Sequence, residues 1–292
     1  MTAQIIDGKK IAEGIRLEIA QEIKARNAIG LPVPGLATVL VGDDPASQIY
    51  VRNKIRVCEQ LGIHSASYTL PADTSIETLS ALIDELNHAP EIHGILVQLP
   101  LPEQIDEYRV LSMINPQKDV DGFQPINAGM LSRKESEPCF VPCTPAGILR
   151  LIQSVQPEIA GLDAVVIGRS SIVGMPTAQL LCRNDATVTI CHTKTQHLPE
   201  ICRRADLLVV AVGQSRMVKA DWIKPGAIVI DVGINRIEDP TAEKGYVLTG
   251  DTDFGAIMKK ARAITPVPGG VGPMTIAMLM QNTLLAATKF SE

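Results

Sequence analysis

The sequence of 292 residues lacks the features of a membrane or nucleic-acid-binding protein. It has no uninterrupted apolar run approaching the roughly 18 residues of a membrane-spanning helix. The amino-terminal segment MTAQIIDGKKIAEG has neither the apolar core of a secretory signal nor the Arg-rich, acid-poor composition of a transit peptide. The formal net charge is −5, and lysines and arginines form no basic stripe. We therefore expect a cytoplasmic protein with neither a membrane nor a nucleic acid as partner.

Metal-binding patterns are also missing. The six cysteines include no CxxC pair, and the five histidines show no HxxxH or HExxH spacing. Cys139 and Cys143 form the one close pair, but no histidine or second pair stands nearby to complete a zinc site. We predict reduced structural thiols and no metal site.

Alternating apolar segments predict two α/β domains. In the first part, predicted strands at 36–41, 65–70 and 93–99 alternate with predicted helices at about 46–61, 75–88 and 106–114. After the proline-rich PCFVPCTPAG, a second series has predicted strands at 163–168, 186–191, 206–213, 227–233 and 263–269. This alternation favours parallel sheets covered on both faces. A last helix with Pro273 in its first turn is apolar on nearly every side, so we expect it to be buried against the first domain.

The helix predicted at 46–61 carries a lysine on its apolar side. At about 100° per residue, Lys54 falls in the middle of an arc formed by Tyr50, Val51, Ile55, Val57, Cys58 and Leu61. A lysine at the edge of such an arc can extend its ammonium to water, but one at the centre must point into a pocket or toward a buried partner. Burial lowers the pKa of a lysine, which suits a base near neutral pH. The alternative is an ordinary lysine whose stem is buried and whose head reaches solvent.

A glycine loop in the second series is typical of a dinucleotide site. VVIGRSSIVGMPTAQLL runs from a strand through a turn into a helix, although the spacing between Gly168 and Gly174 departs from the usual fingerprint. The next strand ends in HTKT, residues 192–195, without the acid that holds the ribose of NAD. Arg169 and the hydroxyl and ammonium groups of this strand end suit an additional phosphate, which predicts NADP. The alternative is a solvated strand end.

Other strand ends carry polar or glycine-rich segments. Gln98 ends a strand and is fixed by the Pro-Leu-Pro that follows it, so its amide is expected to face the crevice at the carboxyl ends of the strands. Asp121 precedes a glycine in NPQKDVDGF, where an Asx-turn is the structural alternative to a binding role. The loop PVPGGVGPMT, residues 266–275, could approach a cofactor or could connect domains.

The motifs in combination resemble a known family. PGLATVLVGDDPASQIYVRNK, VQLPLP, KDVDGF, PCTPAG, GRSSIVGMP, CHTKT and PVPGGVGPMT are similar to, and in the same order as, motifs of the bifunctional methylenetetrahydrofolate dehydrogenase/methenyltetrahydrofolate cyclohydrolases. The resemblance implies two α/β domains around a cleft, the second a Rossmann-type doubly wound parallel sheet. It places a folate-binding domain at 1–143 plus 274–292 and an NADP-binding domain at 144–273. It also implies a homodimer acting in one-carbon metabolism and purine biosynthesis.

The resemblance further implies two reactions and their residues. Methylene-tetrahydrofolate gives a hydride to NADP, and the resulting methenyl cation is hydrolysed to formyl-tetrahydrofolate. The implied catalytic residues are Lys54, Tyr50 and Gln98, and the implied substrate-binding residues are Tyr50, Asp121, Pro268 and Gly269. The implied cofactor-binding residues are Gly168, Arg169, Ser170, Gly174, Thr193, Val212, Gly213, Ile234, Gly272 and Thr275. Thr193 departs from the serine that is commoner in the family, but it keeps a hydroxyl.

Two alternatives belong to other functional classes. The chain could be a non-catalytic module that senses NADP, in which case Lys54, Gln98 and Asp121 have no reason to converge. It could instead be a two-domain dehydrogenase for a small hydroxy or amino acid, which needs no acid for a pterin ring.

Overall fold

The computed structural model describes residues 2–242 and 245–290, which form two compact units. The three-stranded unit comprises residues 13–143 and 276–292, and the six-stranded unit comprises residues 1–12 and 144–275. The outermost residues of the predicted folate domain, 1 and 291–292, lie outside the described part of the chain. The predicted two-domain α/β fold is confirmed.

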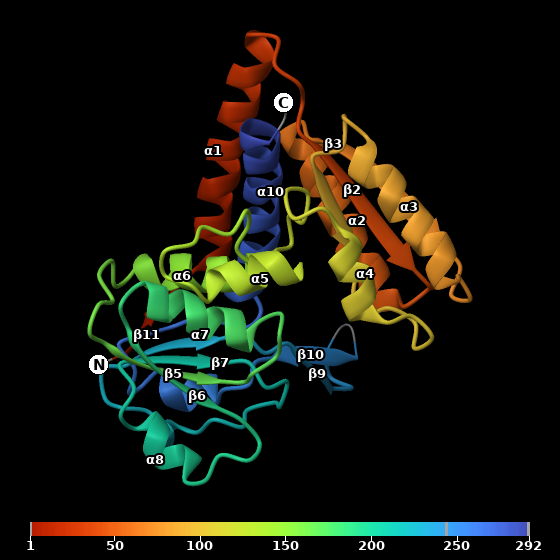
Figure 1. The fold of residues 1–292 in the computed structure, drawn as a ribbon. Helices are drawn as coiled ribbons and strands as arrows, with labels where there is room; N and C mark the ends of the chain where they lie inside the picture. Colours follow the sequence, from red (N-terminus) through yellow and green to blue (C-terminus); the bar gives the residue numbers. More distant parts are fainter. Residues whose placement is uncertain (1, 243–244, 291–292) are drawn as a thin grey trace. The chain divides into compact units, whose positions relative to one another are not determined.

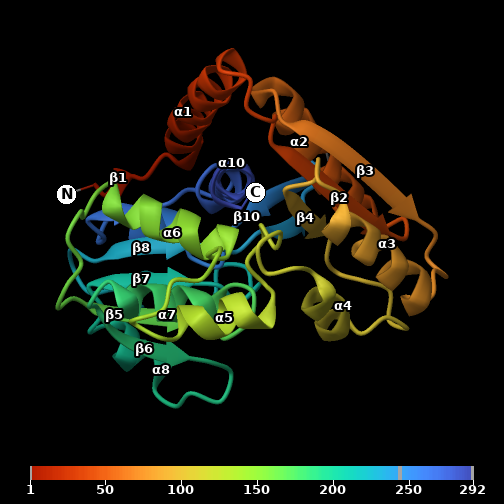
Figure 2. The same ribbon diagram turned by 45° about the horizontal axis from the view of Figure 1, so that its top comes forward.

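The three-stranded unit is a parallel sheet with helices on both faces. β2 (Gly35–Val41) lies between β3 (His64–Leu70) and β4 (Gly94–Val97). α3 (Ile76–His88) and α4 (Glu107–Met113) lie on one face, and α2 (Pro45–Leu61) lies on the other (Figure 2). Because both faces are covered, every residue of β2 is buried, which explains its continuous apolar sequence.

Local signals fix the ends of α2, the helix that carries Lys54. The side chain of Asp44 accepts a hydrogen bond from the backbone N–H of Ser47, and Pro45 occupies the first turn. The helix ends at Gly62, whose φ of 76° is the left-handed conformation that glycine adopts readily. α3 likewise begins after Ser75, whose hydroxyl accepts the N–H of Thr78.

The six-stranded unit is a parallel sheet in the order β1-β11-β8-β7-β5-β6. Its strands are β1 (Gln4–Ile5), β5 (Asp163–Ile167), β6 (Thr187–Cys191), β7 (Leu207–Val210), β8 (Ile228–Asp231) and β11 (Ala263–Ile264). α7 (Gly174–Arg183) lies on one face, and α8 (Leu198–Cys202) lies on the other (Figure 1). The short η1 (Ala220–Trp222) and α9 (Phe254–Ile257) complete this unit, together with an antiparallel hairpin of β9 (Asn235–Glu238) and β10 (Tyr246–Thr249). No pattern in the sequence predicted this hairpin.

The remaining helices are α1 (Gly8–Ala28), α5 (Pro125–Leu131), α6 (Cys143–Gln153) and α10 (Val271–Lys289). The three-stranded unit buries the later turns of α10: the Sγ of Cys58 lies 3.5 Å from the Sδ of Met280, and Arg26 donates to the carbonyl of Ala287. Among the described residues, no helix is both long enough and apolar enough to cross a membrane.

The first twelve residues differ from the predicted domain limits. They group with the six-stranded unit because β1 extends its sheet: the N–H of Gln4 bonds the carbonyl of Arg262, and that of Ile6 bonds Ile264. Two-residue strands at a sheet edge leave little hydrophobic periodicity, so the sequence offered no signal for this pairing.

Candidate active site and nucleotide site

Lys54 points toward the end of a neighbouring strand. Its side chain is half-buried, and its Nζ donates to the Oε1 of Gln98 at 3.0 Å. Gln98 directly follows β4, where its backbone N–H bonds the carbonyl of Val39 and its Nε2 donates to the carbonyl of Leu99 at 2.7 Å. The amide nitrogen is thus occupied, and the amide oxygen is fixed toward the lysine.

The apolar arc of α2 is buried over only part of its width. Val51, Val57, Cys58 and Leu61 are buried, whereas Tyr50 is 46% exposed. Tyr50 stands one turn before Lys54 on the same helix face. This end of the helix is therefore open beside the lysine, which leaves room for a ligand to contact both side chains.

Asp121 completes a group of polar side chains with Lys54. Burial raises the pKa of this half-buried carboxyl, while the positive charge of Lys54 acts in the opposite direction. The carboxyl is therefore close enough to Lys54 to be influenced by its charge. Lys54 thus contacts Gln98 and influences Asp121 within one unit, and the roles of these residues stay a prediction.

The turn that contains Asp121 is held by a different acid. The carboxylate of Asp119 accepts the backbone N–H groups of Phe123 and Gln124 at 3.2 and 2.9 Å, and the Nδ2 of Asn127 at 2.9 Å. Burial raises the pKa of Asp119 to about 7, the negative charge of Asp121 adds to the shift, and the three hydrogen bonds oppose it. Asp119 therefore performs the turn-stabilising role that was the alternative for Asp121.

Cys143 and Asn282 support the same loop from beneath. The thiol of Cys143 donates to the carbonyl of Val120 at 3.3 Å, and the Nδ2 of Asn282 donates to the carbonyls of Val120 and Val141 at 2.8 and 3.1 Å. Burial raises the pKa of Cys143 well above its ordinary value, and the charge of Asp121 adds to the effect. Cys143 is thus a protonated structural thiol.

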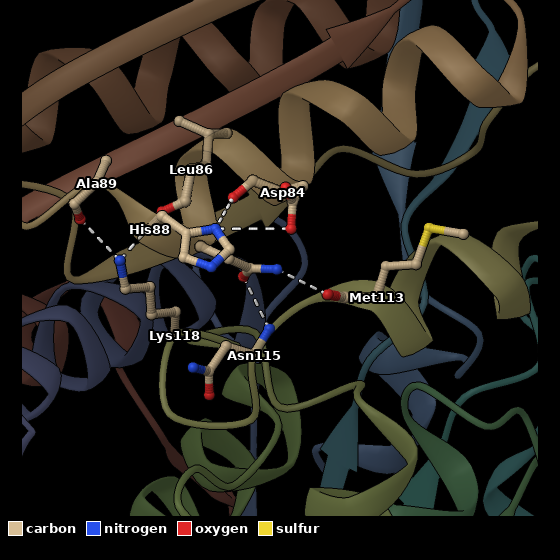
Figure 3. A network of polar contacts seen from close by, with 8 residues as sticks. Asp84, Leu86, His88, Ala89, Met113, Asn115 and Lys118 are labelled. Carbon is tan, nitrogen blue, oxygen red and sulfur yellow. Dashed lines mark hydrogen bonds and ion pairs between the residues drawn. The ribbon is translucent and has the colours of Figure 1, made fainter.

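A cavity of about 420 Å³ elsewhere in the three-stranded unit also contains cationic and polar side chains. The lysine of this cavity caps the end of α3 (Figure 3). The Nζ of Lys118 donates to the carbonyls of Leu86 and Ala89 at 3.0 and 2.7 Å. Asn87 bridges to Met113 and to the N–H of Asn115. Because the last carbonyls of a helix lack partners within it, these contacts explain the polar groups of this cavity as helix capping.

The six-stranded unit has a cavity of about 470 Å³ at the carboxyl ends of three adjacent strands. Gly168 and Arg169 follow β5, Thr193 follows β6, and Val212 follows β7. The full lining is Ile167, Gly168, Arg169, His192, Thr193, Thr195, Leu198, Ala211, Val212, Gln214 and Met217. These described lining residues include a guanidinium and hydroxyl groups but no carboxylate, so the site favours an anionic ligand.

The glycine loop before α7 is closely packed. A Cβ on Gly168 would lie 2.3 Å from the carbonyl oxygen of Ala211, and one on Gly174 would lie 2.3 Å from the carbonyl oxygen of Gly168. The hydroxyl of Ser170 accepts the N–H groups of Val173 and Gly174 at 3.2 and 3.3 Å. Ser170 therefore stabilises the start of α7, and both glycines are required by close backbone approach.

The turn after β6 is fixed by its own side chains. The Oγ1 of Thr195 accepts the N–H of His192 at 2.8 Å, and the Nδ1 of His192 accepts the N–H of Lys194 at 3.2 Å. Thr193 lies in the middle of this turn and lines the cavity.

Comparisons with known proteins agree with this arrangement. Residues 6–121 match the family model "Tetrahydrofolate dehydrogenase/cyclohydrolase, catalytic domain", and residues 142–291 match "Tetrahydrofolate dehydrogenase/cyclohydrolase, NAD(P)-binding domain". The chain belongs to the tetrahydrofolate dehydrogenase/cyclohydrolase family. Both the resemblance and the predicted pairing of dehydrogenase with cyclohydrolase activity are confirmed, and the two alternative functions are not supported.

Individual relatives cover nearly the whole chain. The bifunctional protein FolD 2 of Geobacter sulfurreducens is 55% identical over 285 residues, which is 98% of this chain and 97% of that protein. The crystal structure of the bifunctional FolD enzyme of Campylobacter jejuni is 46% identical with a TM-score of 0.92, covering 98% of this chain and 99% of that one. The Trypanosoma brucei FolD structure, complexed with NADP and an inhibitor, is 41% identical with a TM-score of 0.94, covering 99% and 98%.

Other predicted residues of this tetrahydrofolate dehydrogenase/cyclohydrolase lie in the six-stranded unit outside the cavity lining: Ile234, Pro268 and Gly269 in loops, and Gly272 and Thr275 in the first turns of α10. Ile234 is 50% exposed, and a Cβ on Gly272 would lie 3.9 Å from its Cδ1, so these two residues are adjacent. The hydroxyl of Thr275 lies 2.9 Å from that of Thr144. Gly269, which follows Pro268, has a φ of 108°, and its carbonyl accepts the N–H of Lys9.

Sequence reasoning overlooked several residues that the structure places in the cavity lining or against the loop of Asp121. Gln214, Leu198 and Met217 line the cavity, and Asn282 supports the loop of Asp121. Gln214 had a usable signal, because it follows the glycine at the end of a predicted strand. Asn282 had another, since it lies in the short polar segment Gln281–Asn282–Thr283 of an otherwise apolar helix.

Proposed function

We propose that the three-stranded unit carries the reacting groups of both activities at Lys54, Gln98, Tyr50 and Asp121, and that the cavity of the six-stranded unit binds NADP. The observation that carries this proposal is the fixed bond between the Nζ of Lys54 and the Oε1 of Gln98. A lysine held by an amide oxygen at a strand end, beside a half-buried carboxyl, has little structural purpose there.

The oxidation step needs positioning more than proton transfer. The carbon between two nitrogens of methylene-tetrahydrofolate loses a hydride, and the neighbouring nitrogens stabilise the resulting cation. NADP, when bound, accepts that hydride. The contribution of the chain is to bind and orient the reduced folate, and Tyr50 is available for this because it is exposed beside Lys54.

The hydrolysis step needs proton transfer. Water must lose a proton as it attacks the methenyl carbon, and the departing nitrogen must gain one. The amine of Lys54 can perform both transfers from one position, and Gln98 holds it there through its oriented oxygen. Gln98 cannot itself exchange protons near neutral pH, so it acts as a positioning residue.

Asp121 supplies an acceptor for the pterin ring. The amino-pyrimidinone edge of a pterin presents paired N–H donors, which a carboxylate matches. Because the hydrogen bonds of the turn go to Asp119, the carboxyl of Asp121 is left for a ligand and for Lys54.

The nucleotide cavity fits NADP through its donor set. Arg169 and the hydroxyl of Thr193 lie at the ends of adjacent strands, where the ribose phosphate of a dinucleotide is expected. No described residue of the cavity lining carries the carboxylate that would pair with a free ribose diol. This composition supports a preference for NADP over NAD. The loops around Gly168 and Val212 are then expected to bind the remaining parts of the cofactor.

Further features follow from the resemblance. We include in the proposal a substrate-binding role for Pro268 and Gly269, a homodimeric assembly, and a cytoplasmic location. These extensions rest on membership of the family. Light scattering on the purified chain tests the dimer, for which the expected mass is twice the 31.4 kDa of one chain.

The decisive experiment measures both reactions with purified protein. With methylene-tetrahydrofolate and NADP we expect absorbance of NADPH to appear, followed by conversion of methenyl- to formyl-tetrahydrofolate. Methenyl-tetrahydrofolate supplied without nucleotide should be hydrolysed as well. A protein that binds NADP but catalyses neither reaction would contradict the proposal.

A further inference from the structure

Two acids are buried behind the strand ends of the six-stranded unit. Asp231, the last residue of β8, is 2% exposed, and Asp251, after β10, is 0% exposed. Neither belongs to the described lining of the nucleotide cavity. Burying two carboxylates is costly unless hydrogen bonds satisfy them, so their contacts indicate what they maintain.

Asp251 holds the loop that follows β7. Its Oδ2 accepts the consecutive backbone N–H groups of Val212 and Gly213 at 2.7 and 3.0 Å. Its Oδ1 accepts the Nδ2 of Asn235 at 2.9 Å. Consecutive N–H groups that converge on one point form an anion-binding concavity, and here a carboxylate of the chain fills it. Gly213 has a φ of 64°, which fits such a turn.

Asp231 fixes the segment that carries Asp251. Its Oδ1 accepts the N–H groups of Gly233 and Asp251 at 3.1 and 2.9 Å. Its Oδ2 accepts both the N–H and the hydroxyl of Thr252 at 2.8 and 2.6 Å. The two acids therefore act in series, with Asp231 positioning the backbone of Asp251 and Asp251 positioning Val212 and Gly213.

The backbone packs closely against both carboxylates. A Cβ on Gly233 would lie 2.2 Å from the Cγ of Asp251, and one on Gly250 would lie 2.0 Å from the Oδ2 of Asp231. Both glycines are thus required by carboxylates that press against the main chain. The network joins the ends of β7 and β8 to the start of β9, where Asn235 directly follows Ile234.

We propose that Asp251 is a positioning residue for the dehydrogenase reaction, because it holds Val212, Gly213 and the Ile234–Asn235 segment in the conformation that receives NADP. This rests on the proposed cofactor-binding role of Val212, Gly213 and Ile234. Asp251 itself does not contact the cofactor. Its loss frees two N–H groups and an amide, so that the loop samples conformations that the nucleotide does not fit.

The two activities of one chain provide the test. Hydrolysis of methenyl-tetrahydrofolate uses no nucleotide, so a residue that serves only the cofactor should affect one reaction and spare the other. In Asp251→Ala we expect the Kd and KM for NADP to rise by about tenfold to a hundredfold, the range expected when hydrogen bonds to a charged group are lost. Cyclohydrolase activity, measured without nucleotide, should stay within about twofold, since this part of the reaction involves no cofactor.

A matched control stands two residues further along. Asp253 precedes α9 and makes no side-chain capping bond there. Asp253→Ala should leave the Kd for NADP unchanged in titration calorimetry. A second comparison exchanges the donor and the acceptor: Asp251→Asn combined with Asn235→Asp retains an oxygen for Val212 and Gly213 and a hydrogen bond between the two side chains. This double variant should bind NADP more tightly than Asp251→Ala.

The outcomes separate this inference from the proposed function. An unchanged Kd for NADP in Asp251→Ala would overturn the inference, and so would an equal loss of both activities, which indicates a general structural role. If Arg169→Ala weakens NADP binding while Asp251→Ala does not, the nucleotide site stands and only the positioning role fails. If neither variant affects NADP, the proposed site itself is wrong. Should Asp251→Ala fail to fold, Asp251→Asn takes its place, with an expected severalfold increase in Kd.

Discussion

The two units form their proposed sites from different parts of the chain. The three-stranded unit presents functional side chains, with Lys54 fixed by Gln98 and Asp121 close by. The six-stranded unit instead surrounds a cavity with the loops that follow parallel strands, including the glycine loop at Gly168 and the side chains of Arg169 and Thr193. Proton transfer requires side chains that can give and take a proton. Binding of a long dinucleotide requires instead that the backbone of several loops come close to the ligand.

Both units use buried acids to hold the loops of their sites. Asp119 accepts three hydrogen bonds within the turn that carries Asp121, and Asp251 accepts three from the segments around Val212 and Asn235. In each case one acid stabilises backbone and leaves a neighbouring group available for a ligand. Substitutions of Asp119 and Asp251 should therefore act through loop conformation, whereas those of side chains proposed to contact ligands should act directly.

The largest expected effect separates the two reactions of the three-stranded unit. Lys54→Met keeps the volume but removes the amine, so cyclohydrolase activity should fall by about 10²- to 10⁴-fold, the usual loss for a general acid or base. Dehydrogenase activity should fall less, because hydride transfer needs no proton carrier, and methenyl-tetrahydrofolate should accumulate in the coupled assay. Arg56→Met, on the exposed face of α2, is the control. Equal losses in both reactions would refute this division of roles.

Asp121 should affect both reactions together. Asp121→Ala leaves the paired donors of the pterin without an acceptor, which costs about 1 to 3 kcal/mol, or roughly one to two orders of magnitude in kcat/KM. Steady-state kinetics of the two activities measures this, with Asp73→Ala in an exposed loop as the control. Unchanged folate affinity and rates would mean that Asp121 serves the turn after all.

In the six-stranded unit, Arg169 should determine the choice of cofactor. Arg169→Ala should weaken NADP by about tenfold and NAD much less, because only NADP carries the additional phosphate. The ratio of kcat/KM for the two cofactors reports this, and Lys259→Ala, at an exposed position of the same unit, should leave the ratio unchanged. Comparable efficiency of the wild-type chain with NAD and NADP would contradict the predicted preference.

The last effect is on stability and not on activity, and it concerns pH and Asp119. Its pKa is about 7 in the folded chain, above the ordinary value of 3.8, so between these values the folded state binds more protons than the unfolded state. Since stability falls with pH wherever the folded state binds more protons, this group should lower the free energy of unfolding from about pH 4 to pH 7 and contribute no slope above. Urea denaturation across this range should show a shallower decline in Asp119→Asn. Identical slopes in both proteins would disprove the shift.

Much of the fold could be predicted where the pattern is local. The strand predicted at 36–41 matches β2 within one residue, and the helix predicted at 46–61 matches α2, because continuous apolar runs and helical periodicity persist over these segments. The hairpin β9–β10 and the short α5 were missed, since four-residue strands and a seven-residue helix contain too few residues to establish a period. The segment predicted as a strand at 263–269 forms only the two residues of β11.

Some residues of the candidate site could likewise be identified from local sequence, and others could not. Lys54 could be identified from its place in the apolar arc, and Gln98 from its place at the end of a strand, because both signals lie within a few residues of sequence. Asp119 and Asp121 could not be distinguished, since both precede the same glycine in the sequence. Only the folded turn shows that Asp119 accepts its N–H groups.

The sequence by itself therefore determined the order of the longer strands and helices, the family, and the residues whose chemistry follows from local pattern. Tertiary structure decided which acids are buried against the main chain. Asp251 meets Val212 across 39 residues of sequence, and Asp231 meets Thr252 across 21. No local signal encodes such pairs, because a carboxylate finds backbone donors at that range only after the strands between them have paired and excluded water.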